Sequence, residues 1–278
     1  MKPTVFIAGP VSWNHLVSVD ELPAARPHTA FAKAHRKAVG GTSAGKALNL
    51  VKLGARVTLR TVVGDDEPGR AVLAVLAGAG VEVIAEVADG PTEQHLNLMD
   101  PVGGRVSIYL EVPELREPRH DERAAAALEV ADAAVIDLAE HSRPLLGAAR
   151  AARVPVWCDL HDYDGRSAFH QDFLAAADYL FLNDDGVPDR AELEALLVAA
   201  GARVAVATLG ADGAMAAAAG AVHRVAAVPV ERVVDTNGAG DAFFSGFLVA
   251  HLAGAGVPDA LTAGATAAAR CLGSPDLA

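Results

Sequence analysis

The sequence is poor in aromatic residues, and this shortage limits how the protein can be built. Aromatic residues make up 5% of the 278 residues, although 52% are hydrophobic, so a buried core must consist mainly of Val, Leu, Ile and Ala. Such a hydrophobic content excludes an intrinsically disordered chain. The 26 glycines follow no three-residue period, which excludes a collagen-like chain. A chain of this length can bury a substantial core in one large domain or two smaller ones.

Cysteines and long apolar runs are also scarce. Cys158 and Cys271 lie far apart and form no redox or metal-binding motif, which favours a reducing compartment over a disulfide framework. The most membrane-like stretch, residues 242–258, is shorter than the roughly 20 apolar residues that a spanning helix needs. The apolar run at residues 5–9 is too short for a signal peptide. We therefore expect a cytoplasmic protein that makes no contact with a membrane.

Basic residues are outnumbered, with 23 Lys and Arg against 35 Asp and Glu, which gives a net charge of −12. Affinity for nucleic acid depends largely on clustered Lys and Arg, so we expect no nucleic-acid partner. The charge does not exclude a local anion site, because backbone amides at a helix N-terminus bind phosphate without a basic side chain. All the lysines lie within the first 52 residues, so a cation from the C-terminal half must be arginine or a metal ion.

Short β-branched runs alternate with alanine-rich helical stretches along most of the sequence. This alternation predicts an α/β fold with a mostly parallel central sheet. The expected core strands are residues 5–8, 57–63, 81–87, 133–138, 154–159, 179–182 and 203–208. The expected helices include residues 44–53, 70–79, 145–152 and 191–200, and several end at glycine, a common C-terminal residue of helices.

Two segments depart from this alternation and predict a small separate sheet. Residues 31–39 alternate apolar and charged side chains, as a strand with one face in water does. Residues 93–100 and 105–111 flank a glycine-containing turn and predict a hairpin. Half-exposed antiparallel strands beside a buried parallel sheet favour a lid or a dimer flap, with a decorative hairpin as the alternative.

A second interpretation must be weighed at residues 40–47, Gly-Gly-Thr-Ser-Ala-Gly-Lys-Ala, which nearly match the phosphate loop of P-loop NTPases. Residues 135–137 would add the apolar strand ending in an acid that such enzymes use to hold magnesium. Two observations weigh against this interpretation. Ala47 has no hydroxyl group to bind Mg²⁺, and the preceding strand carries four basic side chains where a P-loop fold needs a buried apolar strand.

The strongest local motif is residues 235–241, Asp-Thr-Asn-Gly-Ala-Gly-Asp, followed at once by the apolar helical residues 242–252. Three small residues before a helix leave backbone N–H groups accessible, and the helix N-terminus adds partial positive charge. Asp241, in the first turn, is then either a helix-capping residue or a general base beside a bound phosphoryl group. A base next to an anion hole is what phosphoryl transfer to an alcohol requires.

This motif resembles the second signature of the ribokinase-like (PfkB-type) carbohydrate kinase family, D-T-x-G-A-G-D-x-F. Gly40-Gly41, with the helix that follows and residues 53–57, resembles the family's sugar-binding glycine loop. Further segments match in the family's order, so the resemblance extends along nearly the entire sequence. These segments are Asn14 with Leu22-Pro23, residues 63–69, residues 76–81 and the nucleotide-binding turn at residues 208–214.

The resemblance implies a three-layer α/β/α kinase domain over residues 1–278, with a small β-sheet lid from about residues 12–39 and 92–112. It implies ATP-dependent, Mg²⁺-assisted phosphorylation of a hydroxymethyl group on a sugar or sugar-like molecule. Asp241 would be the general base, and the amides of Gly238, Ala239 and Gly240 would form the anion hole. The residues implied along the nucleotide are Asn183, Thr208, Gly210, Gly213, Gly238 and Gly240.

On the acceptor side the resemblance implies contacts from Asn14, Gly40 and Gly41, and the same loop adds Gly45. Lys46 and Arg105 would be available to an acidic or phosphorylated acceptor, which suggests a modest preference for a negatively charged sugar. The alternative for both side chains is simple solvation. The resemblance also implies a homodimer through the lid and a monovalent cation near Asp235.

Several positions depart from the family pattern. An asparagine is usual where this sequence has Gly45, an acid where it has Asn14, and a Mg²⁺-supporting glutamate where it has Gly186. Asp184 and Asp185 are candidate metal ligands in its place, with a solvated turn as the alternative. Residues 159–162 are also rich in possible metal ligands, although a polar loop is the favoured interpretation. A nucleoside kinase of the same fold and a non-catalytic sugar- or nucleotide-binding relative therefore stay open as alternatives.

Overall fold

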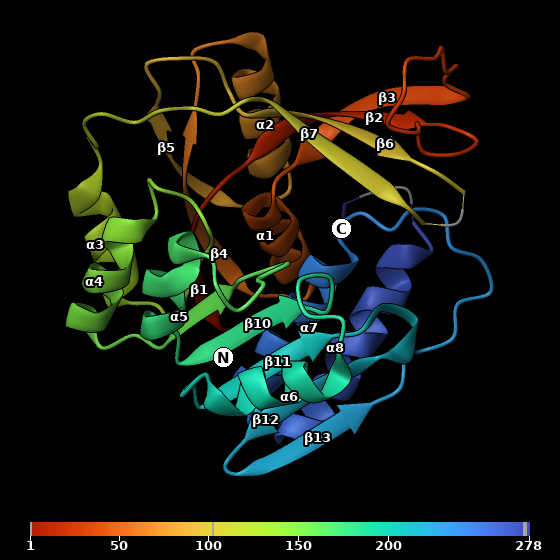
Figure 1. The fold of residues 1–278 in the computed structure, drawn as a ribbon. Helices are drawn as coiled ribbons and strands as arrows, with labels where there is room; N and C mark the ends of the chain where they lie inside the picture. The colour runs from red at the N-terminus through yellow and green to blue at the C-terminus, as the bar shows by residue number, and fades with distance from the viewer. Residues whose placement is uncertain (1, 102, 275–276) are drawn as a thin grey trace.

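The fold contains two separate sheets. A computed structural model describes residues 2–101, 103–274 and 277–278. The large sheet has nine strands in the order β13-β12-β11-β10-β9-β8-β1-β4-β5, and the small sheet has four in the order β3-β2-β6-β7. Figure 1 shows the red and yellow strands of the small sheet gathered together above the large sheet. These sheets and their helices confirm the predicted fold class.

The elements follow one another along the chain, with long connections at residues 19–33 and 226–238. The strands of the large sheet are β1 (Thr4–Ala8), β4 (Arg56–Val63), β5 (Glu82–Val87), β8 (Ala133–Ile136), β9 (Val156–Asp159), β10 (Tyr179–Asn183), β11 (Val204–Thr208), β12 (Ala214–Ala218) and β13 (Ala221–Val225). The helices are α1 (Thr42–Lys52), α2 (Glu67–Gly78), α3 (Asp121–Glu129), α4 (Arg143–Ala152), α5 (Gln171–Ala176), α6 (Arg190–Ala199), α7 (Ala239–Leu252) and α8 (Val257–Leu272). Two short 3₁₀ turns, Ala168–His170 and Gly210–Asp212, complete the described elements.

The strands from β11 to β5 in the sheet order are all parallel, and helices cover both faces. Helices α1, α2, α7 and α8 pack on one face, and α3 to α6 pack on the other. A strand that is buried on both sides must be apolar on both sides, which is why β1 reads Thr-Val-Phe-Ile-Ala without alternation. The predicted continuous apolar runs therefore become the core strands.

The chain changes direction within the large sheet beside β1. It runs from β1 to β4 and β5 on one side, and then returns to place β8 to β11 on the other side. In open parallel sheets such a reversal opens a crevice at the carboxyl ends of the strands, where ligands bind. The residues that end or directly follow these strands are polar, namely Asp137, Asp159, Asn183 and Thr208 after β8, β9, β10 and β11.

The small sheet consists of β2 (Ser12–Ser18), β3 (Ala34–Gly40), β6 (Gln94–Met99) and β7 (Arg105–Glu111). Its strand registers bring Asn14 beside His95, and Asn97 beside Ser107, on one face of the sheet. The opposite face carries the alternate residues of β7, the half-exposed Val106, Ile108 and Leu110. The small sheet thus has one polar face and one apolar face.

Sequence and structure differ at several places, of which two are informative. The strand expected from residue 31 begins at Ala34, and the Phe31 side chain is 83% exposed. The alanine-rich residues 214–218 form β12, an antiparallel strand that the sequence did not predict because alanine is depleted in strands. β3 is exposed at residues 34–37, whereas the strand before a P-loop would be buried, so its exposure agrees with the rejection of a P-loop. Among the described residues, no helix is long and apolar enough to cross a membrane.

One aromatic cluster anchors the face of the large sheet that α7 covers. Trp157 in β9 is completely buried and stacks on Tyr179 of β10, with ring centroids 3.9 Å apart. Phe244 and Phe247 of α7 contact the same indole edge-on. We expect Trp157→Ala to lower the free energy of unfolding by about 3–5 kcal/mol, measured by chemical denaturation. Val198→Ala, an exposed position on α6, should change it by less than about 0.5 kcal/mol; equal effects would contradict this assignment of the core.

Candidate active site

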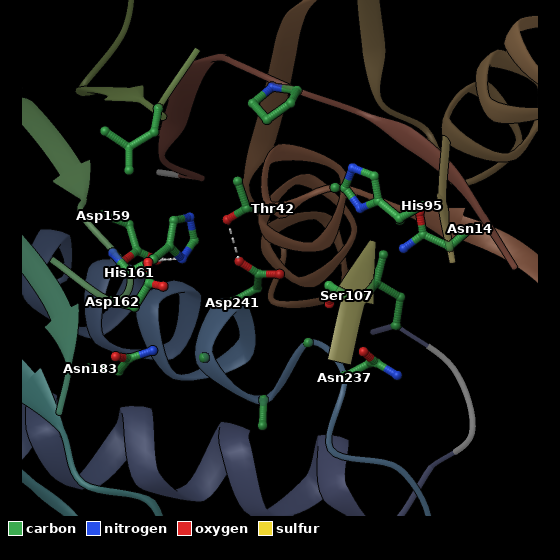
Figure 2. A pocket seen from close by; sticks show the side chains of 18 of the residues that line it. Asn14, Thr42, His95, Ser107, Asp159, His161, Asp162, Asn183, Asn237 and Asp241 are labelled. Carbon is green, nitrogen blue, oxygen red and sulfur yellow. Dashed lines mark hydrogen bonds and ion pairs between the residues drawn. The ribbon is translucent and has the colours of Figure 1, made fainter. Parts of the chain in front are cut away.

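A large cleft lies between the carboxyl ends of the large sheet's strands and the polar face of the small sheet. Its volume is about 2430 Å³, above the roughly 300–1,000 Å³ of an ordinary small-molecule pocket. Figure 2 shows Thr42 and Asp241 in its middle, with Asp159, His161 and Asn183 on one side and Asn14 and His95 on the other. All the predicted site residues line this cleft except Gly45 and Lys46.

The N-terminus of α7 forms one wall of the cleft. Gly238 caps the helix with a left-handed backbone, φ 77°, and no side chain bonds to the first-turn amides. At Gly240 an added Cβ would meet nothing within 4 Å, so open space lies directly in front of this turn. The Ala239 amide donates a long, 3.5 Å hydrogen bond to the Thr236 carbonyl oxygen. The amides of a helix N-terminus and the positive end of the helix dipole attract anions. The geometry therefore fits a phosphoryl group.

Asp241 lies in this first turn, with its side chain 12% exposed. Its Oδ1 accepts a hydrogen bond of 2.8 Å from the Thr42 hydroxyl and lies 3.3 Å from Lys46 Nζ. Its Oδ2 lies against Gly45, where an added Cβ would come within 2.2 Å. Burial raises the pKa of Asp241 above its usual value, and the charge of Lys46 and the Thr42 hydrogen bond partly oppose that rise. Residues of α1 thus hold the Asp241 carboxylate in place, and the carboxylate faces the cleft.

Lys46 lies beneath Asp241 and is completely buried. Its ammonium group contacts Asp137 Oδ1 at 2.9 Å and Asp159 Oδ2 at 3.1 Å, in addition to Asp241. Burial alone would lower the pKa of Lys46, but the three carboxylates outweigh it and raise the pKa above its usual value. The expectation that Lys46 faces an anionic acceptor is therefore wrong, because the α1 backbone directs this side chain toward the strand ends instead.

Asp159 and His161 come from the loop that was interpreted from the sequence as an ordinary polar turn. His161 Nδ1 lies 3.7 Å from Asp159 Oδ2, and both residues line the cleft. Burial disfavours the charged form of Asp159, but His161 and Lys46 outweigh burial and lower its pKa to about 2. Asp137 and Asp159 both stand at the carboxyl ends of adjacent parallel strands, and that position was the sequence signal that could have identified them.

The acceptor side of the cleft is built by the polar face of the small sheet. Asn14 lies in β2, with Gly40 packed so closely that an added Cβ would be 2.1 Å from Asn14 Nδ2. Sequence reasoning missed His95 and Asn97 on β6, both largely buried and both lining the cleft. Among the described residues, Asn97 Oδ1 is one of few buried side-chain oxygens or nitrogens without a protein partner. This oxygen can accept a hydrogen bond from a ligand hydroxyl.

The other end of the cleft runs along β10 and β11. Asn183 and Thr208 end these two strands side by side, and Gly210 and Gly213 form the turn that follows. Gly213 has φ 95°, and an added Cβ would lie 2.0 Å from the Val225 carbonyl oxygen, so only glycine fits there. All four residues line the cleft, together with residues 227–230. The predicted nucleotide-side residues are thus brought together.

The predicted metal ligands are not gathered into a cluster. Asp184 Oδ2 accepts a 2.6 Å hydrogen bond from Arg190, and Asp185 stands beside it at the cleft wall. At Gly186 an added Cβ would lie 2.3 Å from the Asp162 carbonyl oxygen, so the backbone of residues 162 and 163 leaves no room there for the glutamate that the resemblance implies. Within the described ranges, no group of three or more His, Cys, Asp or Glu side chains is arranged to hold a metal ion.

The small sheet contacts the segment just before the anion site through side chains. Arg36 of β3 bonds to Asp235 Oδ2 at 3.1 Å, and Arg105 of β7 bonds to Asn237 Oδ1 at 3.2 Å. Asn237 Nδ2 also lies 3.0 Å from Met99 Sδ of β6. The Asp235 carboxylate, expected near a monovalent cation, is therefore engaged by an arginine, and Arg105 is engaged by the loop.

Comparison with known proteins identifies relatives over almost the whole chain. A family model described as pfkB family carbohydrate kinase matches residues 12–277. An acarbose 7(IV)-phosphotransferase from an Actinoplanes species is 34% identical over 95% of this chain and 90% of its own length. A fructoselysine 6-kinase from Escherichia coli is 30% identical over 84% of this chain and 89% of its own.

Solved structures give the same result. A microbiome-derived acarbose kinase superposes with a TM-score of 0.85 at 29% identity, covering 99% of this chain and 94% of its own. An Arabidopsis thaliana ribokinase, solved with ribose and ATP, superposes with a TM-score of 0.80 at 22% identity. It covers 99% of this chain and 94% of its own, and at that identity it shares the fold.

The contact between Gly45 and Asp241 predicts that two Gly→Ala substitutions change the free energy of unfolding in opposite directions. Gly45→Ala would push Asp241 from Thr42 and Lys46, so we expect it to lower the free energy of unfolding by about 1–3 kcal/mol. The matched control is Gly147→Ala in α4, where an added Cβ meets nothing within 4 Å. It should stabilise the helix by up to about 1 kcal/mol. Urea denaturation measures both; stabilisation by Gly45→Ala would contradict the described contact.

Proposed function

The chain belongs to the pfkB family of carbohydrate kinases, and we propose that Asp241 is the general base of its reaction. The protein is an ATP-dependent kinase that phosphorylates a sugar-like small molecule. The observation that carries the proposal is the position of one carboxylate in the first turn of α7, beside the amides of the helix N-terminus and facing the cleft. A base and an anion site at the same point are what transfer to a hydroxyl group needs.

In the proposed reaction, Asp241 accepts the proton of the acceptor hydroxyl as its oxygen attacks the γ-phosphorus of ATP. The new oxygen–phosphorus bond forms as the bond from the γ-phosphorus to the bridging oxygen breaks, and ADP leaves with that oxygen. The amides of Gly238, Ala239 and Gly240 stabilise the charge on the transferred group, helped by the helix dipole. Burial of Asp241 makes it a stronger base than a solvated aspartate, since burial raises its pKa.

On the nucleotide side, we propose that Asn183, Thr208, Gly210 and Gly213 bind ATP along the ends of β10 and β11. Bound Mg²⁺ would supply charge neutralisation on the phosphates. Asp184 and Asp185 line that wall and stay predicted metal ligands. A monovalent cation near Asp235 also stays a prediction, and it would have to share that carboxylate with Arg36.

On the acceptor side, we propose that Asn14, Gly40, Gly41 and Asn97 contact an acceptor larger than a single sugar ring. The cleft continues past Asp241, away from the nucleotide side, to the ends of β8 and β4 and to helices α3 and α4. Leu138 and His141, which follow β8, and Phe169 of the 3₁₀ turn Ala168–His170 line that continuation. Two relatives named as acarbose kinases, at 34% and 29% identity, support an oligosaccharide-like acceptor. The burial of Lys46 removes one of the two grounds for an anionic acceptor, and the other, Arg105, lines the cleft and bonds to Asn237.

One assay tests base and acceptor together. ADP release should be fastest with acarbose or a related oligosaccharide in a panel that also holds monosaccharides, sugar acids, sugar phosphates and nucleosides. Asp241→Asn should lower the rate with the best acceptor by about 10²–10⁴-fold, because the amide cannot accept the proton. Asp65→Asn, an exposed acid away from the cleft, is the matched control.

Three results of this assay would count against the proposal. Equal rates for the wild type and Asp241→Asn would rule out Asp241 as the base. A monosaccharide or a nucleoside as best acceptor would reject the large acceptor. No turnover with any acceptor would favour the non-catalytic binding protein.

We also propose that a second copy of the chain covers the apolar face of the small sheet. Val106, Ile108 and Leu110 alternate along β7 on the face turned away from the cleft, and all three are half-exposed. β7 is also an edge strand of its sheet. A row of apolar side chains at a sheet edge favours association with another chain.

We expect light scattering after gel filtration to give twice the chain mass for the wild type. Ile108→Lys should give the mass of one chain, because it places a charge in the middle of the apolar row. Val198→Lys, an exposed position on α6, is the control and should keep the mass of the wild type. A wild type that stays monomeric as concentration increases would reject the dimer.

A further inference from the structure

We propose that Lys46 is a positioning residue whose buried ammonium group keeps the Asp241 carboxylate charged and fixed toward the cleft. The inference rests on the proposed role of Asp241 as the general base. It assigns a function to a side chain that touches neither acceptor nor nucleotide. Lys46 does not line the cleft, and its effect on the reaction passes through Asp241 alone.

The first support is the geometry of the ammonium group. Lys46 Nζ lies 2.9 Å from Asp137, 3.1 Å from Asp159 and 3.3 Å from Asp241, and the lysine side chain has no exposed surface. Asp137 and Asp159 belong to adjacent strands of the large sheet, and Ser43 also bonds to Asp137 at 2.7 Å. The sheet therefore fixes the position of the ammonium group through Asp137 and Asp159, and the ammonium group in turn fixes Asp241.

The second support is how α1 makes room for this contact. Gly45 has no side chain, and Asp241 Oδ2 occupies the space where a Cβ would be, 2.2 Å from its ideal position. Thr42, one turn earlier, donates to Asp241 Oδ1 and accepts a hydrogen bond from Lys46. Residues 42, 45 and 46 thus present a hydroxyl, a gap and a cation to the same carboxylate. The glycine that departs from the family pattern is what lets Asp241 approach the lysine.

The third support is the balance of charge around the base. A general base must be ionised before it can accept a proton. Burial and the Asp159 carboxylate both raise the pKa of Asp241, whereas Lys46, the Thr42 hydroxyl and His161 lower it. The thiol of Cys271 on α8 also faces Asp241, and Asp137 competes for the same ammonium group. Of the cations among these groups, Lys46 alone is fully buried, so solvent screens its charge least.

The test is the pH profile of kcat/KM for the best acceptor at saturating ATP and Mg²⁺. The rate of an enzyme with a carboxylate base falls as pH decreases through the pKa of that base. Lys46→Met removes the charge and keeps the length of the side chain. We expect it to shift this acid limb to higher pH by about one to three pH units, the usual effect of one neighbouring charge. At pH values above the shifted limb, part of the lost activity should return.

Two further variants separate positioning from simple support of the fold. Asp137→Asn breaks the same buried cluster but removes a negative charge, so its acid limb should stay in place or move to lower pH. Leu50→Ala, completely buried on the same helix, should lower stability and leave the limb in place. Each profile is repeated in a His161→Gln background, because the charge of His161 also acts on Asp241.

Loss of Lys46 leaves buried carboxylates without their cation and can prevent folding. The double variant Lys46→Met, Asp137→Asn removes one charge of each sign, and it too should shift the limb to higher pH. A shift of the acid limb to higher pH in Lys46→Met or in the double variant supports the proposal. A limb unchanged in every soluble Lys46 variant overturns it, and so does an upward shift of equal size in Asp137→Asn. If Asp241→Asn keeps full activity, the proposed base itself is wrong, and that result is distinguishable from an unchanged limb.

Discussion

The contact of one buried ammonium group with three carboxylates connects the main parts of this protein. Lys46 comes from α1, Asp137 and Asp159 stand at the ends of β8 and β9, and Asp241 comes from α7. A charge without exposed surface is stable only when partners satisfy it, so these four residues constrain one another's positions. The first helix, the sheet and the helix that carries the anion site are therefore held in one arrangement.

The sheet topology explains why the contact forms there. Parallel strands end at the same edge, and the reversal of strand order beside β1 opens a crevice at that edge. Polar residues at the ends of β9, β10 and β11 face this crevice, and the small sheet closes it from the other side. Acceptor, phosphoryl group and nucleotide can thus share one continuous cleft, in which Arg36, Arg60, Arg105 and Arg116 are the lining basic residues among the described ones.

The sequence predicted the local features well, because they depend on neighbours in the chain. Core strands such as β1 follow from apolar runs, and the start of α7 follows from three small residues before a helix. Long-range contacts were not predictable. From the sequence, Lys46 was expected to be a cation for the acceptor, because no neighbouring residue indicates its contact with Asp137, 91 positions away. Gly186 was interpreted only as the loss of a glutamate, because its packing against residue 162 is a tertiary contact that the sequence does not show.

The bonds from Arg36 to Asp235 and from Arg105 to Asn237 tie the small sheet to the loop that precedes the anion site. These are polar contacts near the surface, with Arg36 44% exposed, so dissolved ions weaken them far more than they weaken apolar packing. The contact between the small sheet and this loop is thus sensitive to ionic strength, whereas the buried contacts of Lys46 are shielded from it. Salt acts selectively on one half of the catalytic cleft.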